Sequence, residues 1–305
     1  MKWAAGIDVG GTNLKAVAVG LDGVVRSRLV RATGDDPARN SDWAAQGRDI
    51  LAALTGTQPA APTAVGLCAP GLAAPDGRCI AHLPGKLAGL AGLDWTIALG
   101  QSRLVPVLND AQAALLGEAW VGAARGRRHV VMLTLGTGVG GAVICDGRLL
   151  RGAIGRAGHI GHLSLDPGGP RSIVGMPGAL ETMIGDCTVA ARSGGKFATT
   201  AALVAAHRAG DDFASEIWLK SVRALAFGLG SCINLFDPEV IVLGGGIAQA
   251  GAALFPPLAA ELDRIEWRPG GHRVPIAPAA LGEWAGALGA ARQSLETADL
   301  FPSLA

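Results

Sequence analysis

The sequence predicts an α/β protein built from two related halves. Apolar, β-branched runs alternate along the chain with amphipathic stretches of helical period. A strand, a glycine-rich turn and a second strand occur near the N-terminus, and the same plan recurs before the middle of the chain. The length of 305 residues corresponds to about two domains of roughly 150 residues each. We therefore expect two compact lobes that flank a cleft.

Composition excludes several classes of protein. Half of the residues are hydrophobic, 17% are charged and the formal net charge is +1, so the chain is not of the disordered kind. No basic run indicates a nucleic-acid partner. The five cysteines are scattered without a CxxC pair, which favours reduced thiols. The long uncharged runs 50–75 and 240–260 are broken by glycine and proline, and Asp8 comes too early for a signal peptide. We expect no membrane partner and a cytoplasmic location.

The first glycine cluster lies within residues 4–25, AAGIDVGGTNLKAVAVGLDGVV. This segment predicts a strand, a glycine turn, an alternating strand with Leu14, Ala16 and Ala18 on one face, and a third strand after an Asp22-Gly23 hairpin turn. Both the Walker loop and the dinucleotide fingerprint need a helix directly after the glycines. A meander therefore argues against both of these folds.

The second glycine cluster repeats this plan in residues 129–150, HVVMLTLGTGVGGAVICDGRLL, with an Asp146-Gly147 turn. Glycine turns between strands bring several backbone N–H groups together, and such groups suit phosphate oxygens. One such turn alone is typical of an ordinary hairpin, but the repetition favours two turns that hold a polyphosphate between them. A third cluster, Gly244 to Gly246, also follows an apolar strand-like run.

The remaining elements follow from apolar periodicity. Helices are expected at Asp42–Leu54, Ala111–Arg125, Ala201–Ala209, Asp212–Leu235, Ala248–Ile265 and Glu283–Leu295. The glycine- and proline-rich stretch from Asp166 to Gly178 predicts a surface loop. The boundary between the two halves is expected near the helix that begins at Ala111.

Polar residues at three places in the chain are candidates for chemistry. Asn109 and Asp110 end a buried strand just before a helix, so they indicate either an N-cap or a carboxylate base that accepts the proton of a phosphoryl-acceptor hydroxyl. His159, His162 and Glu181 are typical of a metal site, of hydrogen bonding to a polyol, or of structural histidines. Zinc is disfavoured among these because no cysteine lies between Asp166 and Glu181. Asp8, before the first glycine turn, is either a ligand of hydrated Mg²⁺ or a plain strand-end aspartate.

Six segments in this order resemble the ROK family of sugar kinases and sugar-sensing repressors over nearly the whole chain: GIDVGGTNLKAVAV, APGLAAPDG, PVLNDAQAALLGE, LTLGTGVGGAVI, AGHIGH and NLFDPEVIVLGGGIA. The resemblance implies the actin-like ATPase (ribonuclease H-like) α/β fold, two-lobed with a central cleft. It implies a small lobe of residues 1–110 plus a C-terminal helix at about 291–305, and a large lobe of residues 111–290. The first two glycine turns then look like phosphate loops, and FDPEVIVLGGGI looks like an adenosine-binding segment.

The resemblance also implies an ATP-dependent, glucokinase-like hexose kinase in which Asp110 is the general base that deprotonates the 6-hydroxyl of the sugar. The implied sugar-binding residues are Gly71, Asn109, His159, His162 and Glu181. The implied ATP-binding residues are Asp8, Gly10, Gly11, Thr12, Asn13, Gly136, Thr137, Gly138, Gly245 and Gly246, and Asp8 is expected to hold Mg²⁺ through water. A homodimer is expected. The alternatives are an N-acetylmannosamine kinase and a non-catalytic sugar sensor, while a DNA-binding repressor is not expected because the first motif begins at Gly6.

Three departures from the family pattern bear on these expectations. Ser172, Val174 and Ala179 stand where the family has three zinc-binding cysteines, so no structural zinc is expected and the loop must be held by packing. His159 replaces the glutamate of the ExGH motif, and Pro84-Gly85 replaces a Pro-Asn pair. Both changes concern the identity of the sugar and leave the type of reaction unchanged.

Overall fold

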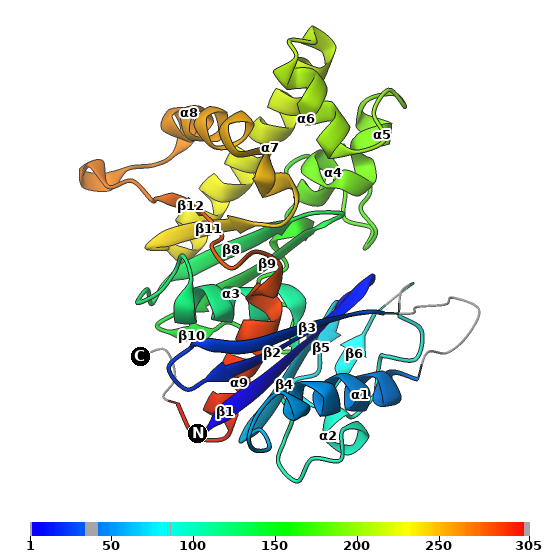
Figure 1. The fold of residues 1–305 in the computed structure, drawn as a ribbon. Helices are drawn as coiled ribbons and strands as arrows, with labels where there is room; N and C mark the ends of the chain where they lie inside the picture. The colour runs from blue at the N-terminus through cyan, green and yellow to red at the C-terminus, as the bar shows by residue number, and fades with distance from the viewer. Residues whose placement is uncertain (1, 34–41, 84, 86, 302–305) are drawn as a thin grey trace. The chain divides into compact units, whose positions relative to one another are not determined.

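The computed structural model describes residues 2–33, 42–83, 85 and 87–301. Pro84, which belongs to one of the sequence departures, lies outside the described residues. The chain divides into two compact units (Figure 1). Unit 1 comprises Met1–Arg128, Asp146–Ala157 and Ala280–Ala305, and unit 2 comprises His129–Cys145 and Gly158–Ala279.

Unit 1 is built on a five-stranded sheet. Its strands are β1 (Trp3–Val9), β2 (Asn13–Gly20), β3 (Val25–Ala32), β4 (Ala64–Ala69) and β7 (Val107–Asn109), in the order β3-β2-β1-β4-β7. The first three strands pair antiparallel, as the predicted meander requires, whereas β4 and β7 run parallel to β1. A short hairpin of β5 (Leu72–Ala73) and β6 (Ile80–His82) follows β4.

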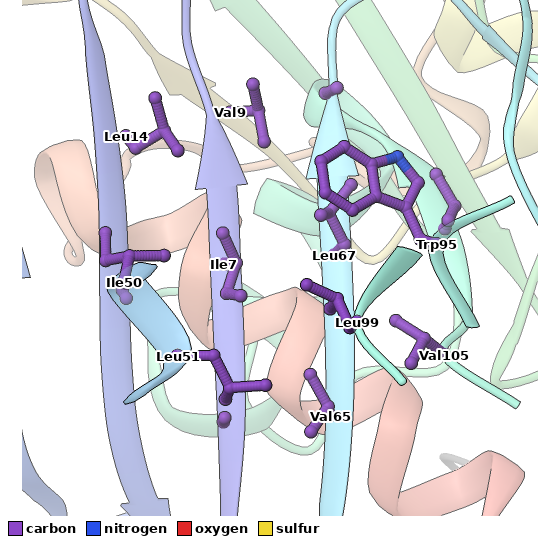
Figure 2. Packing of buried hydrophobic residues seen from close by; sticks show 14 of the residues in the cluster. Ile7, Val9, Leu14, Ile50, Leu51, Val65, Leu67, Trp95, Leu99 and Val105 are labelled. Carbon is purple, nitrogen blue, oxygen red and sulfur yellow. The ribbon is translucent and has the colours of Figure 1, made fainter. Parts of the chain in front are cut away.

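Helices cover both faces of this sheet, so its central strands are buried on both sides. On one face α1 (Trp43–Gly56) and α2 (Trp95–Ala98) meet the strands, and Figure 2 shows Ile50 and Trp95 among side chains of β1, β2 and β4. Leu14, Ala16 and Ala18 face this core as predicted. Val17 and Val19 point the other way, into a core with α3 (Asp110–Val121) and α9 (Ala285–Thr297).

Glycines let α9 approach its neighbours closely. A Cβ atom on Gly6 of β1 would lie 1.9 Å from the carbonyl oxygen of Ala287, and one on Gly66 of β4 would lie 2.0 Å from that of Ala290. Gly289 meets α3 in the same way, 1.6 Å from the carbonyl oxygen of Ala113. The helix backbone therefore packs directly on the sheet and on α3.

Unit 2 repeats the sheet topology. Its strands are β8 (Val130–Leu135), β9 (Val139–Cys145), β11 (Val240–Gly244) and β12 (Ile276–Pro278), and the sheet has the order β10-β9-β8-β11-β12, with the short strand β10 (Arg148–Leu149) next to β9 in the chain. In both sheets the third, second, first, fourth and fifth strands of the sheet lie side by side in that order. Asp146 and Gly147 both have positive φ, as a two-residue hairpin turn needs. The predicted internal duplication is confirmed.

The helices of unit 2 are α4 (Leu180–Ile184), α5 (Val189–Arg192), α6 (Thr200–Arg208), α7 (Asp212–Phe236) and α8 (Phe255–Ile265). The prediction of a single helix at Ala248–Ile265 is wrong. The chain forms 3₁₀ turns at Ile247–Ala253, Gly251 adopts φ 54° and ψ −117°, and α8 starts with Pro256 in its first turn. No helix among the described residues is both long and apolar enough to cross a membrane.

The compact units differ from the predicted lobe limits. Helix α3, the segment Asp146–Ala157 and all of α9 belong to unit 1, which the predicted small lobe of residues 1–110 and about 291–305 does not include in full. The physical reason lies in the backbone contact of α9 with α3 and with the first sheet, because helices packed that closely form one core.

Candidate active site

Three polar residues gather where parallel strands of unit 1 end. β1 pairs with β4, and β4 with β7, so that Asp8 lies beside Cys68 and Ala69 lies beside Asn109. Asn109 caps α3, because its Oδ1 accepts hydrogen bonds from the backbone N–H groups of Ala111 (2.9 Å) and Gln112 (3.3 Å). Its Nδ2 donates to the carbonyl oxygen of Gly71 at 2.8 Å. The capping interpretation is thus confirmed for Asn109. Its side chain is also hydrogen-bonded to Gly71, the other predicted sugar-binding residue of this region.

Asp110 is the first residue of α3. Its Oδ1 accepts the N–H of Ala111 at 2.8 Å, which fixes the orientation of the carboxylate. The N-terminus of a helix favours a negative charge, because unpaired N–H groups and the helix dipole point toward it. The arrangement can hold an ionised carboxylate at the carboxyl edge of the sheet.

Asp8 lies between Lys15 of β2 and Cys68 of β4. Burial, followed by the negative charge of Asp110, raises the pKa of Asp8 to about 7, although the side chain keeps some exposure. A hydrogen bond from the Cys68 thiol and the charge of Lys15 act in the opposite direction. Burial and the charge of Asp8 raise the pKa of Cys68, so its S–H stays available as a donor. The neighbouring carboxylates of Asp8 and Asp110 favour the binding of a cation, because a positive charge offsets their mutual repulsion.

The first glycine turn follows Asp8 directly. Its backbone closes with a hydrogen bond from Gly10 N–H to the carbonyl oxygen of Asn13 (3.0 Å), and Thr33 braces it from β3's end through bonds to Gly10 and Thr12. Gly11 and Thr12 are exposed, and a Cβ atom on Gly11 would meet nothing within 4 Å. The turn therefore offers open backbone to an anionic ligand.

The second glycine turn joins β8 to β9 in unit 2, and the segment 181–188 braces it. Glu181 Oε2 accepts the N–H of Val139 at 3.0 Å. Two further bonds run from Asp186 N–H to the carbonyl oxygen of Gly136 (3.0 Å) and from Cys187 N–H to that of Thr137 (2.9 Å). Glu181, predicted to bind sugar, therefore also supports the predicted phosphate turn.

A cavity of about 580 Å³ lies beside this turn in unit 2. It brings together three predicted ATP-binding residues, Gly136, Thr137 and Gly246. The other lining residues are Asp186, Thr199, Thr200, Ala201, Val204, Arg208, Ile247, Gln249 and Ala250. Gly138 and Gly245 are not among the lining residues. Gly245 has a packing role instead, since its φ is +87° and a Cβ atom there would lie 2.3 Å from the carbonyl oxygen of Leu135.

The two histidines lie together in unit 2. His162 ends a 3₁₀ turn at Ile160–His162, and its ring lies nearly parallel to that of His159 with centroids 6.3 Å apart. Gly161 lets this turn contact β9, because a Cβ atom there would lie 1.9 Å from the carbonyl oxygen of Val139. The Nδ1 atom of His162 is buried and has no hydrogen-bond partner among the described residues. A buried ring nitrogen without a partner is costly, which is consistent with a ligand group in that place.

Hydrogen bonds close the loop that carries the substituted cysteine positions. The Ser164 hydroxyl donates to the carbonyl oxygen of Pro177 (2.6 Å), and Gly178 N–H donates to that of Pro170 (2.8 Å). Ile173 and Val174 at the tip of the loop are 80% and 58% exposed, whereas Ala179 at its end is fully buried. In the part of the chain that the structure describes, no three His, Cys, Asp or Glu side chains are grouped for a metal ion.

The sequence model of the ROK family matches residues 4–296. The chain belongs to the ROK family.

Two named sugar kinases resemble this chain over most of its length. A glucokinase from Thermotoga maritima is 33% identical, over 83% of this chain and 84% of its own. An N-acetylmannosamine kinase from Escherichia coli O157:H7 is 34% identical, over 93% of this chain and 96% of its own.

Solved ROK structures share the fold. A ROK hexokinase from Thermus thermophilus has a TM-score of 0.86 and 32% identity, covering 97% of this chain and 99% of its own. A ROK glucokinase from Streptomyces griseus, solved with glucose and AMPPNP, has a TM-score of 0.76 and 26% identity, covering 96% and 99%. Together with the duplicated strand order, they confirm the predicted fold class, an α/β actin-like ATPase fold.

Sequence reasoning missed several residues of the unit 2 cavity and one neighbour of Asp8. Among them, Thr199 and Thr200 could have been found, because a Thr-Thr pair before an apolar helix is typical of an N-cap. The other polar residues among them carry no local signal: Cys68, Asp186, Arg208 and Gln249.

Proposed function

We propose that this ROK protein is an ATP-dependent hexose kinase that transfers the γ-phosphoryl group of ATP to the 6-hydroxyl of a sugar, with glucose the first candidate. Its relatives place it among the sugar kinases of the family. The observation that carries the finer proposal is Asp110, fixed by the Ala111 N–H at the start of α3 and close enough to Asp8 for their charges to interact.

Asp110 acts as the general base in this proposal. A hydroxyl attacks phosphorus more readily as its proton leaves, and a positioned carboxylate supplies the acceptor for that proton. Gly71 and Asn109, joined by their hydrogen bond, are the proposed sugar contacts of unit 1. Glu181, His159 and His162 are the proposed sugar contacts from unit 2.

The unit 2 cavity is the proposed site of the phosphoryl donor. Ala201, Val204 and Ile247 give it apolar walls that suit a nucleoside, while the Gly136–Thr137 backbone suits the phosphates. Arg208 is the one basic side chain among the described residues that line it. A free polyphosphate needs many cations along its length, so this lining favours ATP as the donor.

Mg²⁺ enters as part of the MgATP substrate. Burial, followed by the charge of Asp110, raises the pKa of Asp8. A hydrated Mg²⁺ takes one or two carboxylates along with phosphate oxygens, so Asp8 and the first glycine turn fit this ion. The ion supplies positive charge to the phosphates.

We further propose a homodimer, to be checked by light scattering, and a cytoplasmic location, where ATP is made.

An N-acetylmannosamine kinase is the second candidate. The N-acetylmannosamine kinase matches 93% of this chain, against 83% for the Thermotoga glucokinase. The reaction and the proposed base are the same in both candidates, so substrate trials decide between them.

The test is the release of ADP by the purified protein over a panel of glucose, mannose, fructose, allose, N-acetylglucosamine and N-acetylmannosamine. One sugar is expected to stimulate turnover. Asp110→Asn is expected to lower kcat by about 10²- to 10⁴-fold, the usual contribution of a general base. Asp49→Asn, at an exposed position of α1, is the matched control and is expected to keep full activity.

Two results would contradict the proposal. Asp110→Asn with wild-type kcat would remove Asp110 as the base. If no sugar stimulated turnover, while a sugar still raised the melting temperature, the protein would be a sugar sensor.

A further inference from the structure

One residue joins three walls of the unit 2 cavity. The backbone N–H of Asp186 bonds to Gly136 of the glycine turn, as described above. Its carboxylate Oδ1 accepts the backbone N–H of Thr200, the first residue of α6, at 2.5 Å. Asp186 itself lines the cavity. The turn, the segment 181–188 and the start of α6 are therefore tied together at this residue.

The same carboxylate sets the charge at the start of α6. The N-terminus of a helix is an attractive place for a phosphate group. At the N-terminus of α6 the carboxylate of Asp186 already occupies this place. Thr199 Oγ1 accepts a second hydrogen bond there, from the N–H of Ala202 at 3.1 Å. A negative charge at this wall repels the phosphates of a donor, while the Gly136–Thr137 turn carries none.

One residue that lines the cavity, Thr200, has a buried hydroxyl without a hydrogen-bond partner among the described residues. Thr200 lines the cavity and is 4% exposed. A polar ligand group in this place would satisfy the hydroxyl.

We propose that Asp186 is a positioning residue of the phosphoryl-donor site. It holds α6 against the glycine turn and keeps the donor's phosphates at the turn, away from the α6 N-terminus. The carboxylate of Asp186 accepts a hydrogen bond from the backbone N–H of Thr200, so Asp186 acts on the donor through α6 and the glycine turn. This inference rests on the proposed ATP-dependent kinase function.

The test compares Asp186→Ala and Asp186→Asn with the wild type in steady-state kinetics. Asp186→Ala loses the acceptor for Thr200 N–H, and the KM for ATP is expected to rise about tenfold, which corresponds to roughly one lost hydrogen bond to a charged group. The KM for the sugar is expected to stay within about twofold, since the bond of Glu181 to Val139 does not involve Asp186. Asp186→Asn keeps an oxygen at Oδ1 and is expected to restore most of the ATP affinity.

The charge is tested with inorganic phosphate as a competitor of ATP. Asp186→Asn removes only the charge, so phosphate is expected to inhibit about two- to fivefold more strongly, as the strength of a helix terminus implies. Unchanged inhibition by phosphate would overturn the charge role.

Asp211→Ala is the matched control for stability. Asp211 caps α7 by accepting the N–H of Ala214 at 2.8 Å and does not line the cavity. Each alanine variant loses a carboxylate that accepts a backbone N–H at the start of a helix, and both are expected to lower the melting temperature, but only Asp186→Ala is expected to raise the KM for ATP. An unchanged KM for ATP in Asp186→Ala, or equal rises for ATP and sugar, would overturn the positioning role. If the wild type shows no sugar-dependent turnover, the proposed function itself fails, which is a distinct result.

Discussion

At the scale of single residues, one side chain serves several purposes. The amide of Asn109 caps α3 with its oxygen and bonds to Gly71 with its nitrogen, so the N-cap and binding-site interpretations of the sequence are compatible. Asp8 depends on groups that the sequence does not place next to it. Cys68 is its neighbour through strand pairing, and Asp110 lies about a hundred residues further on in the chain.

Asp8 predicts a pH dependence of stability. Its pKa is about 7 in the folded protein and 3.8 when unperturbed, so folding favours the protonated form. The stabilising effect is complete below pH 3.8 and is lost as the pH rises through about 7. Asp8→Asn imitates the protonated side chain. We expect this variant to exceed the wild type in stability at pH 8 by up to about 4 kcal/mol, an upper bound from the pKa difference, and the gap to close near pH 4.

Denaturant titration of both proteins in metal-free buffer measures this gap. A constant difference between pH 4 and pH 8 would contradict the prediction. The addition of Mg²⁺ at pH 8 is expected to narrow the gap, because a cation near Asp8 stabilises the ionised wild-type carboxylate and leaves the amide unaffected.

At the scale of elements, the packing of α9 on the sheet and on α3 depends on the small size of glycine as much as on hydrophobicity. Gly289 puts α9 on α3 at a distance that no side chain permits. We expect Gly289→Ala to lower the free energy of unfolding by at least about 1 to 3 kcal/mol, the usual cost of overpacking, and thermal unfolding measures it.

Gly56 is the control for that substitution. It is the last residue of α1, and a Cβ atom there would meet nothing within 4 Å. Gly56→Ala is therefore expected to be neutral or to stabilise slightly, since the unfolded chain has less backbone entropy with alanine than with glycine. Equal losses for the two variants would show that close packing is not the cause.

The hydrogen-bonded loop 164–179 gives a second prediction at this scale. Its closure relies on Ser164 and on backbone bonds, so a zinc chelator is expected to leave the melting temperature unchanged. Ser164→Ala is expected to lower the stability by about 1 kcal/mol, the usual net value of one hydrogen bond. A fall in melting temperature on chelation, reversed by zinc, would contradict this account.

At the scale of the whole molecule, unit 1 carries the first sheet with the first glycine turn, and unit 2 carries β8, β9, β11 and β12 with the second glycine turn. The proposed base is in unit 1 and the proposed donor cavity is in unit 2, so their functions can be separated by mutation. Asp110→Asn is expected to keep the thermal shift caused by MgATP.

Gly246→Val tests the other unit. A Cβ atom on Gly246 would meet nothing within 4 Å, so the fold tolerates the change while the added atoms reach into the cavity that Gly246 lines. The variant is expected to lose the thermal shift caused by MgATP and to keep the shift caused by the sugar. Loss of both shifts, or of neither, would contradict the assignment of the donor to this cavity.

The sequence by itself determined the fold class, the two meanders and most helix positions, because these follow from periodicity, turn residues and glycine clusters within short segments. It also identified Asn109, Asp110 and the two glycine turns as polar or open positions at strand ends. Tertiary structure decided the limits of the units, the raised pKa of Asp8 and the hydrogen bonds by which Asp186 joins the second glycine turn to α6. These properties arise from burial, charge and hydrogen bonds between residues far apart in the chain, and no local pattern records them.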